Sequence, residues 1–286
     1  MLFGMMVNRV GIVGLGLIGA SIAKALRQAR SDVHLVGVDA ESCTARLSHN
    51  QSLFNHLEHT ITPTSALAQC DLVFVATPLE SIPDVFKLLS GSLGEQGVVT
   101  DVCGVKEVVM QWAETLLPQH HFVGGHPMVG GPTGGFKHSQ EHLFSGHEVA
   151  LCPQPASPPA IVDTLSELWQ VMGAKVQVMP AVEHDQWVAI TSHLPYVTAV
   201  AQTLLAGQHA STPPLQGPSF QDATKRAAFS PDIMASVLEN NRHAPSHIRA
   251  LANILIELSQ HLNNAPQDFR EMSKKARELQ TQFKHD

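Results

Sequence analysis

Apolar runs of strand length alternate with amphipathic stretches over the first 180 residues of the chain. The runs cover residues 9–13, 33–38, 72–76, 98–101, 121–124, 148–151 and 175–178. Short apolar strands separated by helical stretches are typical of βαβ units, so this part is expected to be α/β, with a mostly parallel sheet covered by helices.

The pattern changes after residue 180. Residues 181–206 contain one strong helix breaker, Pro195, and residues 207–219 form a segment rich in Pro, Gly, Ser and Thr. From residue 220 onwards polar and charged residues recur at helical spacing. The sequence therefore predicts two domains, 1–180 with the sheet and 181–286 all helical, and a length of 286 residues also favours two domains.

The first apolar run leads directly into a glycine motif, VGIVGLGLIGAS, with G-x-G-x-x-G spacing. Its first glycine allows a tight turn, the second lets a pyrophosphate approach the backbone, and the third lets the next helix, predicted over 20–27, lie close to the strand. The free N–H groups of that helix suit phosphate oxygens. The expected cofactor contacts are Gly14, Leu15, Gly16, Leu17, Ile18 and Gly19.

Three further strand ends extend the predicted cofactor edge. Asp39 ends the second run, 20 residues after Gly19, where a carboxylate binds ribose hydroxyls and repels a 2′-phosphate. The cofactor is therefore expected to be NAD. Thr77 and Pro78 follow the 72–76 run, and Asp101 ends the 98–101 run. The alternatives are an ordinary turn at Thr77 and Pro78 and a helix cap at Asp101.

Two histidines stand out among the 17 in the chain. His126, in FVGGHPMVGG, follows a strand, where a neutral imidazole could accept a proton from a substrate hydroxyl. The alternative is a hydrogen-bonded structural histidine. His193 lies about two helical turns after Asp185, roughly on the same side of the helix.

Composition excludes several classes of protein. The net charge of −7, from 18 basic and 25 acidic residues, disfavours binding to nucleic acid. No apolar run is long enough for a membrane span, and the N-terminal residues lack the pattern of a secretory signal. The four cysteines are widely spaced, which is typical of reduced thiols in a cytoplasmic protein. No pair of histidines has a convincing metal-ligand setting, so no metal is expected.

Several motifs together resemble a known family. The segments GLGLIGAS, VATP, TDVCGVK, GGHPM, HD, SHLP and GPSFQDATKR, in this order over nearly the whole chain, are similar to the prephenate and arogenate dehydrogenases of tyrosine biosynthesis. The resemblance implies a nucleotide-binding domain and a helical domain that forms a homodimer. It also implies NAD-dependent oxidative decarboxylation of prephenate or arogenate to 4-hydroxyphenylpyruvate or tyrosine, with His126 taking or orienting the hydroxyl proton.

The chain departs from the family pattern at the implied substrate contacts. Gly104 stands where members usually have a serine that helps to hold the catalytic histidine, so water or a neighbour such as Thr133 would replace its hydroxyl. His193 is retained, but Tyr196 occupies a position where many prephenate-using members have a second histidine. The family's carboxylate-binding arginine aligns with Lys225, and Arg226 takes its place if the alignment slips by one residue.

Other functions stay open at this point. One is a family member acting on a related cyclohexadienyl acid, such as an amino analogue of prephenate in secondary metabolism. A second is a simple NAD-dependent β-hydroxy-acid dehydrogenase, with Lys225 as its catalytic lysine. A third is a non-catalytic NAD-binding protein. The tyrosine pathway is favoured because most family members serve it.

Overall fold

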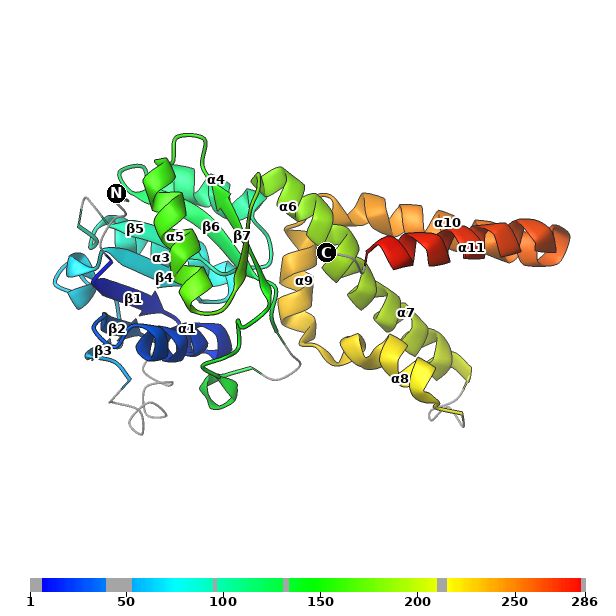
Figure 1. Ribbon diagram of the computed structural model, residues 1–286, viewed down its shortest axis with the longest axis horizontal. Coiled ribbons are helices and arrows are strands. Elements are labelled where there is room, and N and C mark those ends of the chain that lie inside the picture. Colours follow the sequence, from blue (N-terminus) through cyan, green and yellow to red (C-terminus); the bar gives the residue numbers. More distant parts are fainter. Residues whose placement is uncertain (1–6, 40–52, 95–96, 131–133, 210–214, 284–286) are drawn as a thin grey trace. The chain divides into compact units, whose positions relative to one another are not determined.

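The computed structural model describes residues 7–39, 53–94, 97–130, 134–209 and 215–283. The chain divides into two compact units, Met1–Arg242 and His243–Asp286. The first unit contains the sheet and the helices up to α9, and the second contains α10 and α11 (Figure 1).

In the described part of the chain, eight strands form one sheet in the order β3-β2-β1-β4-β5-β6-β7-β8. Neighbouring strands are parallel except β6 and β7, which are antiparallel. The strands are β1 (Arg9–Val13), β2 (His34–Val38), β3 (His56–Glu58), β4 (Leu72–Val75), β5 (Val98–Asp101), β6 (His121–Pro127), β7 (Glu148–Pro153) and β8 (Lys175–Val178). The predicted mostly parallel α/β sheet is confirmed.

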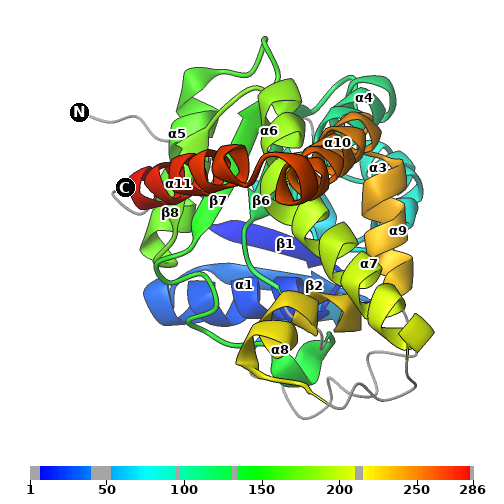
Figure 2. The ribbon, with the colours of Figure 1, turned by 90° about the vertical axis from the view of Figure 1, so that its right-hand side faces the viewer.

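Helices cover both faces of this sheet, as Figure 2 shows. The covering helices are α1 (Leu17–Ala29), α3 (Ile82–Ser90), α4 (Glu107–Leu116) and α5 (Pro159–Val171). Apolar side chains of α1 and α5, including Leu26 and Trp169, share one buried cluster with the sheet. Those of α3 and α4, including Phe86 and Val109, share a second cluster on the other face. The sheet is therefore buried on both sides, which explains its nearly continuous apolar strands.

Two details of the sheet differ from the sequence prediction. The three-residue strand β3 was not predicted, because HLE carries no apolar run. The strand predicted over 121–124 continues to Pro127, since Gly125 and His126 pair with Leu151 and Ala150 of β7. His126 is therefore held in the strand by sheet pairing rather than lying in a loop.

The helical region begins directly after the sheet. Its elements are α6 (Ala181–Val188), a π-helical turn (Ala189–His193), α7 (Leu194–His209), α8 (Pro218–Thr224), a 3₁₀ turn (Lys225–Ala228) and α9 (Pro231–Glu239). The wide π turn ends two residues before Pro195, whose missing N–H cannot take part in the α-helical bonding. The loop predicted over 207–219 starts late, because α7 continues to His209; residues 210–214 lie outside the described residues.

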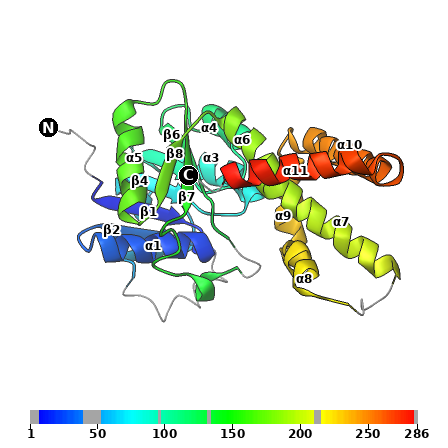
Figure 3. The same ribbon diagram turned by 45° about the vertical axis from the view of Figure 1, so that its right-hand side comes forward.

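The second unit is a pair of helices, α10 (Ala244–Asn264) and α11 (Pro266–Gln282), which lie side by side in Figures 1 and 3. The connection at Ala265 is short, which is typical of helical hairpins. None of the described helices is sufficiently long and apolar to cross a membrane.

The glycine motif forms the turn from β1 into α1. Gly14 has φ +91°, and a Cβ there would lie 2.6 Å from the Ala76 carbonyl oxygen. A Cβ on Gly19 would lie 1.9 Å from the Gly14 carbonyl oxygen, whereas a Cβ on Gly16 would meet no atom within 4 Å. Gly14 and Gly19 are thus required by the fold, and Gly16 is not.

This difference predicts how alanine substitutions at the motif affect stability. Gly19→Ala should lower the free energy of unfolding by about 3 kcal/mol, because backbone atoms cannot move aside as side chains do. Gly16→Ala is the matched control and should change it by no more than about 0.5 kcal/mol. Urea unfolding of both variants measures the difference, and equal losses would contradict it.

Candidate active site

The glycine loop offers an open surface at the carboxyl edge of the sheet. Gly16 is the N-cap of α1, and no side chain caps the helix there. Leu17 and Ile18 form its first turn. Open space at Gly16 beside uncapped helix N–H groups fits the phosphates of a dinucleotide.

The ends of β2 and β4 lie at the same edge, since β1, β2 and β4 are parallel. Asp39 Oδ2 accepts a hydrogen bond of 2.9 Å from the Leu15 N–H, which places this carboxylate against the glycine loop. Thr77 is partly exposed, and its Oγ1 is buried without a hydrogen-bond partner in the described structure. Pro78 begins the 3₁₀ turn Leu79–Ser81.

Asp101 has a structural role inside the fold. Its side chain has no exposed surface and pairs with Lys106, which is equally buried. Asp101 also accepts the N–H groups of Cys103 and Gly125, at 2.9 and 3.1 Å. The carboxylate therefore has no surface to offer a cofactor. Asp101 does not cap the next helix, because α4 begins six residues later and its first N–H groups are bonded by the Asp185 carboxylate.

Lys106 fixes the strand that carries His126. Its Nζ contacts Asp101 and donates to the Gly125 carbonyl oxygen at 2.7 Å. Unpairing a buried charge of this kind costs on the order of 3–5 kcal/mol, so the backbone immediately before His126 is firmly held.

The cap of α4 comes from Asp185 on α6. Its Oδ1 accepts the Lys106 N–H at 2.8 Å, and its Oδ2 accepts the Glu107 N–H at 2.9 Å. Burial alone would raise the pKa of the Asp185 carboxyl, but hydrogen bonds from His184 and these two N–H groups outweigh it and lower the pKa. Asp185 is therefore a carboxylate at neutral pH.

A chain of hydrogen bonds connects Asp185 to His126. His184 Nδ1 lies 2.7 Å from Asp185 Oδ1, and His184 Nε2 lies 2.8 Å from His126 Nδ1. A carboxylate only accepts, so His184 donates from Nδ1. When His184 is neutral its Nε2 must accept, and His126 donates from Nδ1. The chain thus leaves the lone pair of His126 on Nε2.

His126 is also uncharged at neutral pH. Burial, followed by the electrostatic effects of His184, Lys106 and His193, lowers the pKa of His126 well below its usual value of 6.5. A neutral imidazole with a lone pair on Nε2 is a proton acceptor. Its position at the carboxyl end of β6 is the one predicted for a catalytic base.

Gly104 lies directly beside that lone pair. A Cβ on Gly104 would stand 3.8 Å from His126 Nε2 and 3.6 Å from Val237 Cγ1 of α9. These are ordinary contact distances, so a larger residue would fit. Thr133, the suggested replacement for the missing hydroxyl, lies outside the described residues.

His193 belongs to the same buried network. Its Nδ1 lies 3.2 Å from Asn241 Nδ2, and that nitrogen also donates to the Asp185 carbonyl oxygen at 2.8 Å. Asn241 therefore contacts both Asp185 and His193, as expected if these two residues face the same side of the helix. Tyr196 is partly buried in the first turn of α7.

The two predicted carboxylate-binding residues lie apart from this network. Lys225 is exposed and pairs with Asp222 at 3.1 Å, and Arg226 is exposed in the same 3₁₀ turn. This turn packs against α7. No described contact joins either side chain to His126, so their role stays a prediction.

Sequence reasoning missed three members of the network. His184 was passed over although it adjoins Asp185, because helical spacing drew attention to Asp185 and His193. Lys106 was an available signal, as a lysine within the apolar TDVCGVK segment. Asn241 carried no signal, since it lies 56 residues after Asp185 in the short connection between α9 and α10.

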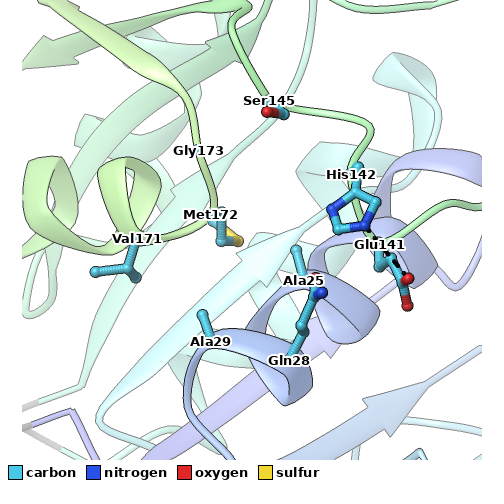
Figure 4. Close-up of a pocket in the computed structure, with 9 residues that line it drawn as sticks. All are labelled: Ala25, Gln28, Ala29, Glu141, His142, Ser145, Val171, Met172 and Gly173. Atoms are coloured by element: carbon cyan, nitrogen blue, oxygen red, sulfur yellow. Dashed lines mark ion pairs between the residues drawn. The ribbon is translucent and has the colours of Figure 1, made fainter.

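A separate pocket lies at the C-terminal end of α1, at the opposite end of this helix from the glycine loop (Figure 4). Its lining includes Gln28, Met172 and an exposed ion pair between Glu141 and His142. None of the network residues lines it. Among the described residues, no three His, Cys, Asp or Glu side chains gather in a way that could hold a metal ion.

Comparison with known proteins agrees with this geometry. The family model "Prephenate dehydrogenase, nucleotide-binding domain" matches residues 22–178, and "Prephenate dehydrogenase, dimerization domain" matches residues 180–279. The chain is 28% identical to the cyclohexadienyl dehydrogenase of Zymomonas mobilis, covering 88% of this chain and 86% of that protein. It is 27% identical to the prephenate dehydrogenase of Bacillus subtilis, covering 83% of this chain and 65% of that protein.

A solved structure is similar over the whole chain. The crystal structure of prephenate dehydrogenase from A. aeolicus, in complex with hydroxyphenyl propionate and NAD+, has a TM-score of 0.87 and 26% identity. The match covers 98% of this chain and 99% of that chain. The chain therefore belongs to the prephenate dehydrogenase family, a family of NAD-dependent oxidoreductases.

Proposed function

We propose that this protein catalyses the NAD-dependent oxidative decarboxylation of prephenate or arogenate in tyrosine biosynthesis. The observation that carries the proposal is the hydrogen-bonded chain from Asp185 through His184 to His126, which leaves a lone pair on His126 Nε2. A neutral base at the sheet edge that binds nucleotides is what removal of a proton from a substrate hydroxyl requires. Family membership supports the substrate class.

The residues of the glycine loop fit NAD. Gly16 leaves room for a pyrophosphate, and Thr77 Oγ1 is a buried polar atom without a partner in the described structure. Asp39 lies against the glycine loop, where its carboxylate would bind the adenosine ribose. When bound, NAD supplies the hydride acceptor.

His126 takes the proton of the substrate hydroxyl on Nε2. The ring then becomes positively charged, and its Nδ1–H already points to His184, which is anchored on the Asp185 carboxylate. The negative end of the chain stabilises the new charge, as a buried aspartate does behind a catalytic histidine in serine hydrolases. Loss of the ring carboxylate as carbon dioxide then gives an aromatic product.

The helical region supports a finer proposal on assembly, and the buried cysteines of the sheet region bear on location. We expect a homodimer formed by this region, which matches the dimerization-domain model and exposes large apolar side chains such as Leu204 and Ile233.

We place the enzyme in the cytoplasm. Cys70 and Cys152 are buried free thiols, and burial raises the pKa of each to about 12, so both resist oxidation. Cys43 lies outside the described residues.

The proposal predicts NADH formation with carbon dioxide release from one of the two acids. Prephenate and arogenate should be assayed in parallel, each with NAD and NADP, and NAD should be preferred. His126→Asn should lower kcat by roughly a hundredfold or more, because it removes the proton acceptor. Turnover of neither acid would overturn the proposal, and an unchanged rate would remove His126 from the mechanism.

The pH profile of kcat/KM gives an independent check on His126. The neutral ring is the active form, so activity is lost as the pH falls through its pKa. Because that pKa lies well below 6.5, kcat/KM should stay level through pH 6.5 and fall only in more acidic buffer.

Substitutions of His184 test the chain behind His126. His184→Leu leaves His126 Nδ1 without an acceptor, so kcat should fall roughly tenfold to a hundredfold, with a change in KM of no more than about twofold. His184→Gln keeps an acceptor oxygen and should lose less. Steady-state kinetics separate the two, and equal losses would show that His184 only fills space.

Gly104 tests the substrate pocket. Gly104→Ser would put a hydroxyl beside His126 Nε2, and it should raise kcat/KM for the preferred acid by roughly tenfold, the worth of one hydrogen bond. Gly104→Ala fills the same space without a hydroxyl and should fall short of the serine variant. If Gly104→Ser lowers kcat/KM and Gly104→Ala does not, the natural substrate occupies the space beside Gly104, as an amino analogue of prephenate could.

A further inference from the structure

Asn241 is a buried residue two positions after the end of α9, and no motif of the sequence drew attention to its amide. Its side chain is almost completely enclosed, with a relative exposure of 1%. The same nitrogen, Nδ2, lies 2.8 Å from the Asp185 carbonyl oxygen and 3.2 Å from His193 Nδ1. One amide group therefore connects the Asp185 backbone to the second histidine of the site.

Chemistry fixes the direction of both bonds. A backbone carbonyl only accepts, so the NH₂ end of Asn241, and not its oxygen, must face Asp185. The second hydrogen of that NH₂ group is then donated to His193 Nδ1, which must carry a lone pair. In a neutral imidazole the one ring proton is consequently on Nε2.

His193 is neutral in this environment. Burial, opposed by the Asp185 carboxylate and assisted by His184, lowers the pKa of His193 to about 4. His193 therefore presents a single N–H donor, at Nε2. His126 has the opposite arrangement, with its proton on Nδ1 and its lone pair on Nε2.

We propose that Asn241 is a positioning residue that fixes His193 as a hydrogen-bond donor for an oxygen of the substrate. Asp185 then fixes opposite hydrogen-bonding roles for the two histidines. Its carboxylate, through His184, makes His126 Nε2 an acceptor. Its backbone carbonyl orients the Asn241 amide, which makes His193 Nε2 a donor. This inference rests on the proposed function, because the oxygen that would accept from His193 belongs to the cyclohexadienyl acid.

The surroundings of Asn241 hold it in this position. The next residue, Arg242, forms a two-point ion pair with Glu107 at the start of α4, with contacts of 2.5 and 3.2 Å. α4 is also the helix that Asp185 caps, so both ends of the Asn241 link are attached to one element. An aspartate at position 241 would set an oxygen against the Asp185 carbonyl and accept from His193 instead of donating.

The tautomer can be measured without any substrate. Long-range ¹H–¹⁵N spectra of protein labelled with ¹⁵N-histidine distinguish protonated from unprotonated ring nitrogens, and His193→Gln identifies the signals that belong to His193. We expect His193 to be protonated on Nε2 and His126 on Nδ1. A proton on Nδ1 of His193 in the unsubstituted protein overturns the inference, whether or not any acid is turned over.

A double-mutant cycle tests the consequence for catalysis. Asn241→Ala should lower kcat/KM about tenfold in the unsubstituted protein, but no more than about twofold in the His193→Gln background, where no tautomer needs to be fixed. Asn240→Ala is the matched control, since Asn240 bonds only within its own helix, to the Ser236 carbonyl oxygen, and it should leave kcat/KM unchanged. An equal loss in both backgrounds would show that Asn241 acts on the fold and not through His193.

Discussion

The site depends on one buried carboxylate. Asp185 has a relative exposure of 1%, and a charge in such a place is tolerated only when its oxygens are well satisfied. It accepts two backbone N–H groups from the start of α4 and one ring N–H from His184. The same bonds that stabilise the charge therefore attach α6 to α4 and orient the imidazole behind His126. Structural support and the preparation of the proposed catalytic base are one set of interactions.

The sequence was sufficient for the sheet because its signals are local. Apolar runs marked all strands but β3, which is short and partly polar, and the glycine spacing placed the turn from β1 to α1. The positions of Gly14 and Gly19 are demanded by close backbone contacts, so a sequence pattern and a steric requirement coincide. What local patterns could not give was the length of β6, because its last residues are strand only through pairing with β7.

The network at the site was less predictable because its contacts join distant parts of the chain. His126 was found from its place after a strand, but its partner His184 is 58 residues away, and Asn241 lies farther still. Spacing on a helix could relate Asp185 to His193, yet it could not show that the Asn241 amide, which follows α9, would bridge them. The role of Asp101 was misjudged for a related reason, since only the folded structure shows that Lys106 turns inward to meet it.

The departures from the family pattern leave the proton chain untouched. Gly104 lies against the lone pair of His126 and against Val237 of α9, while Asp185, His184 and His126 are joined behind it. Asp185 and His184 act on the proposed base, His126, from its buried side. Gly104 and Val237 shape the pocket on the side that faces α9. Substitutions on the pocket side can therefore change which acid is accepted while the way its proton is removed stays the same. Val237 on α9 lines this wall, and Asn241, two residues after the end of α9, contacts His193. We therefore propose that α9 and the residues directly after it influence both how the substrate fits and how it is held.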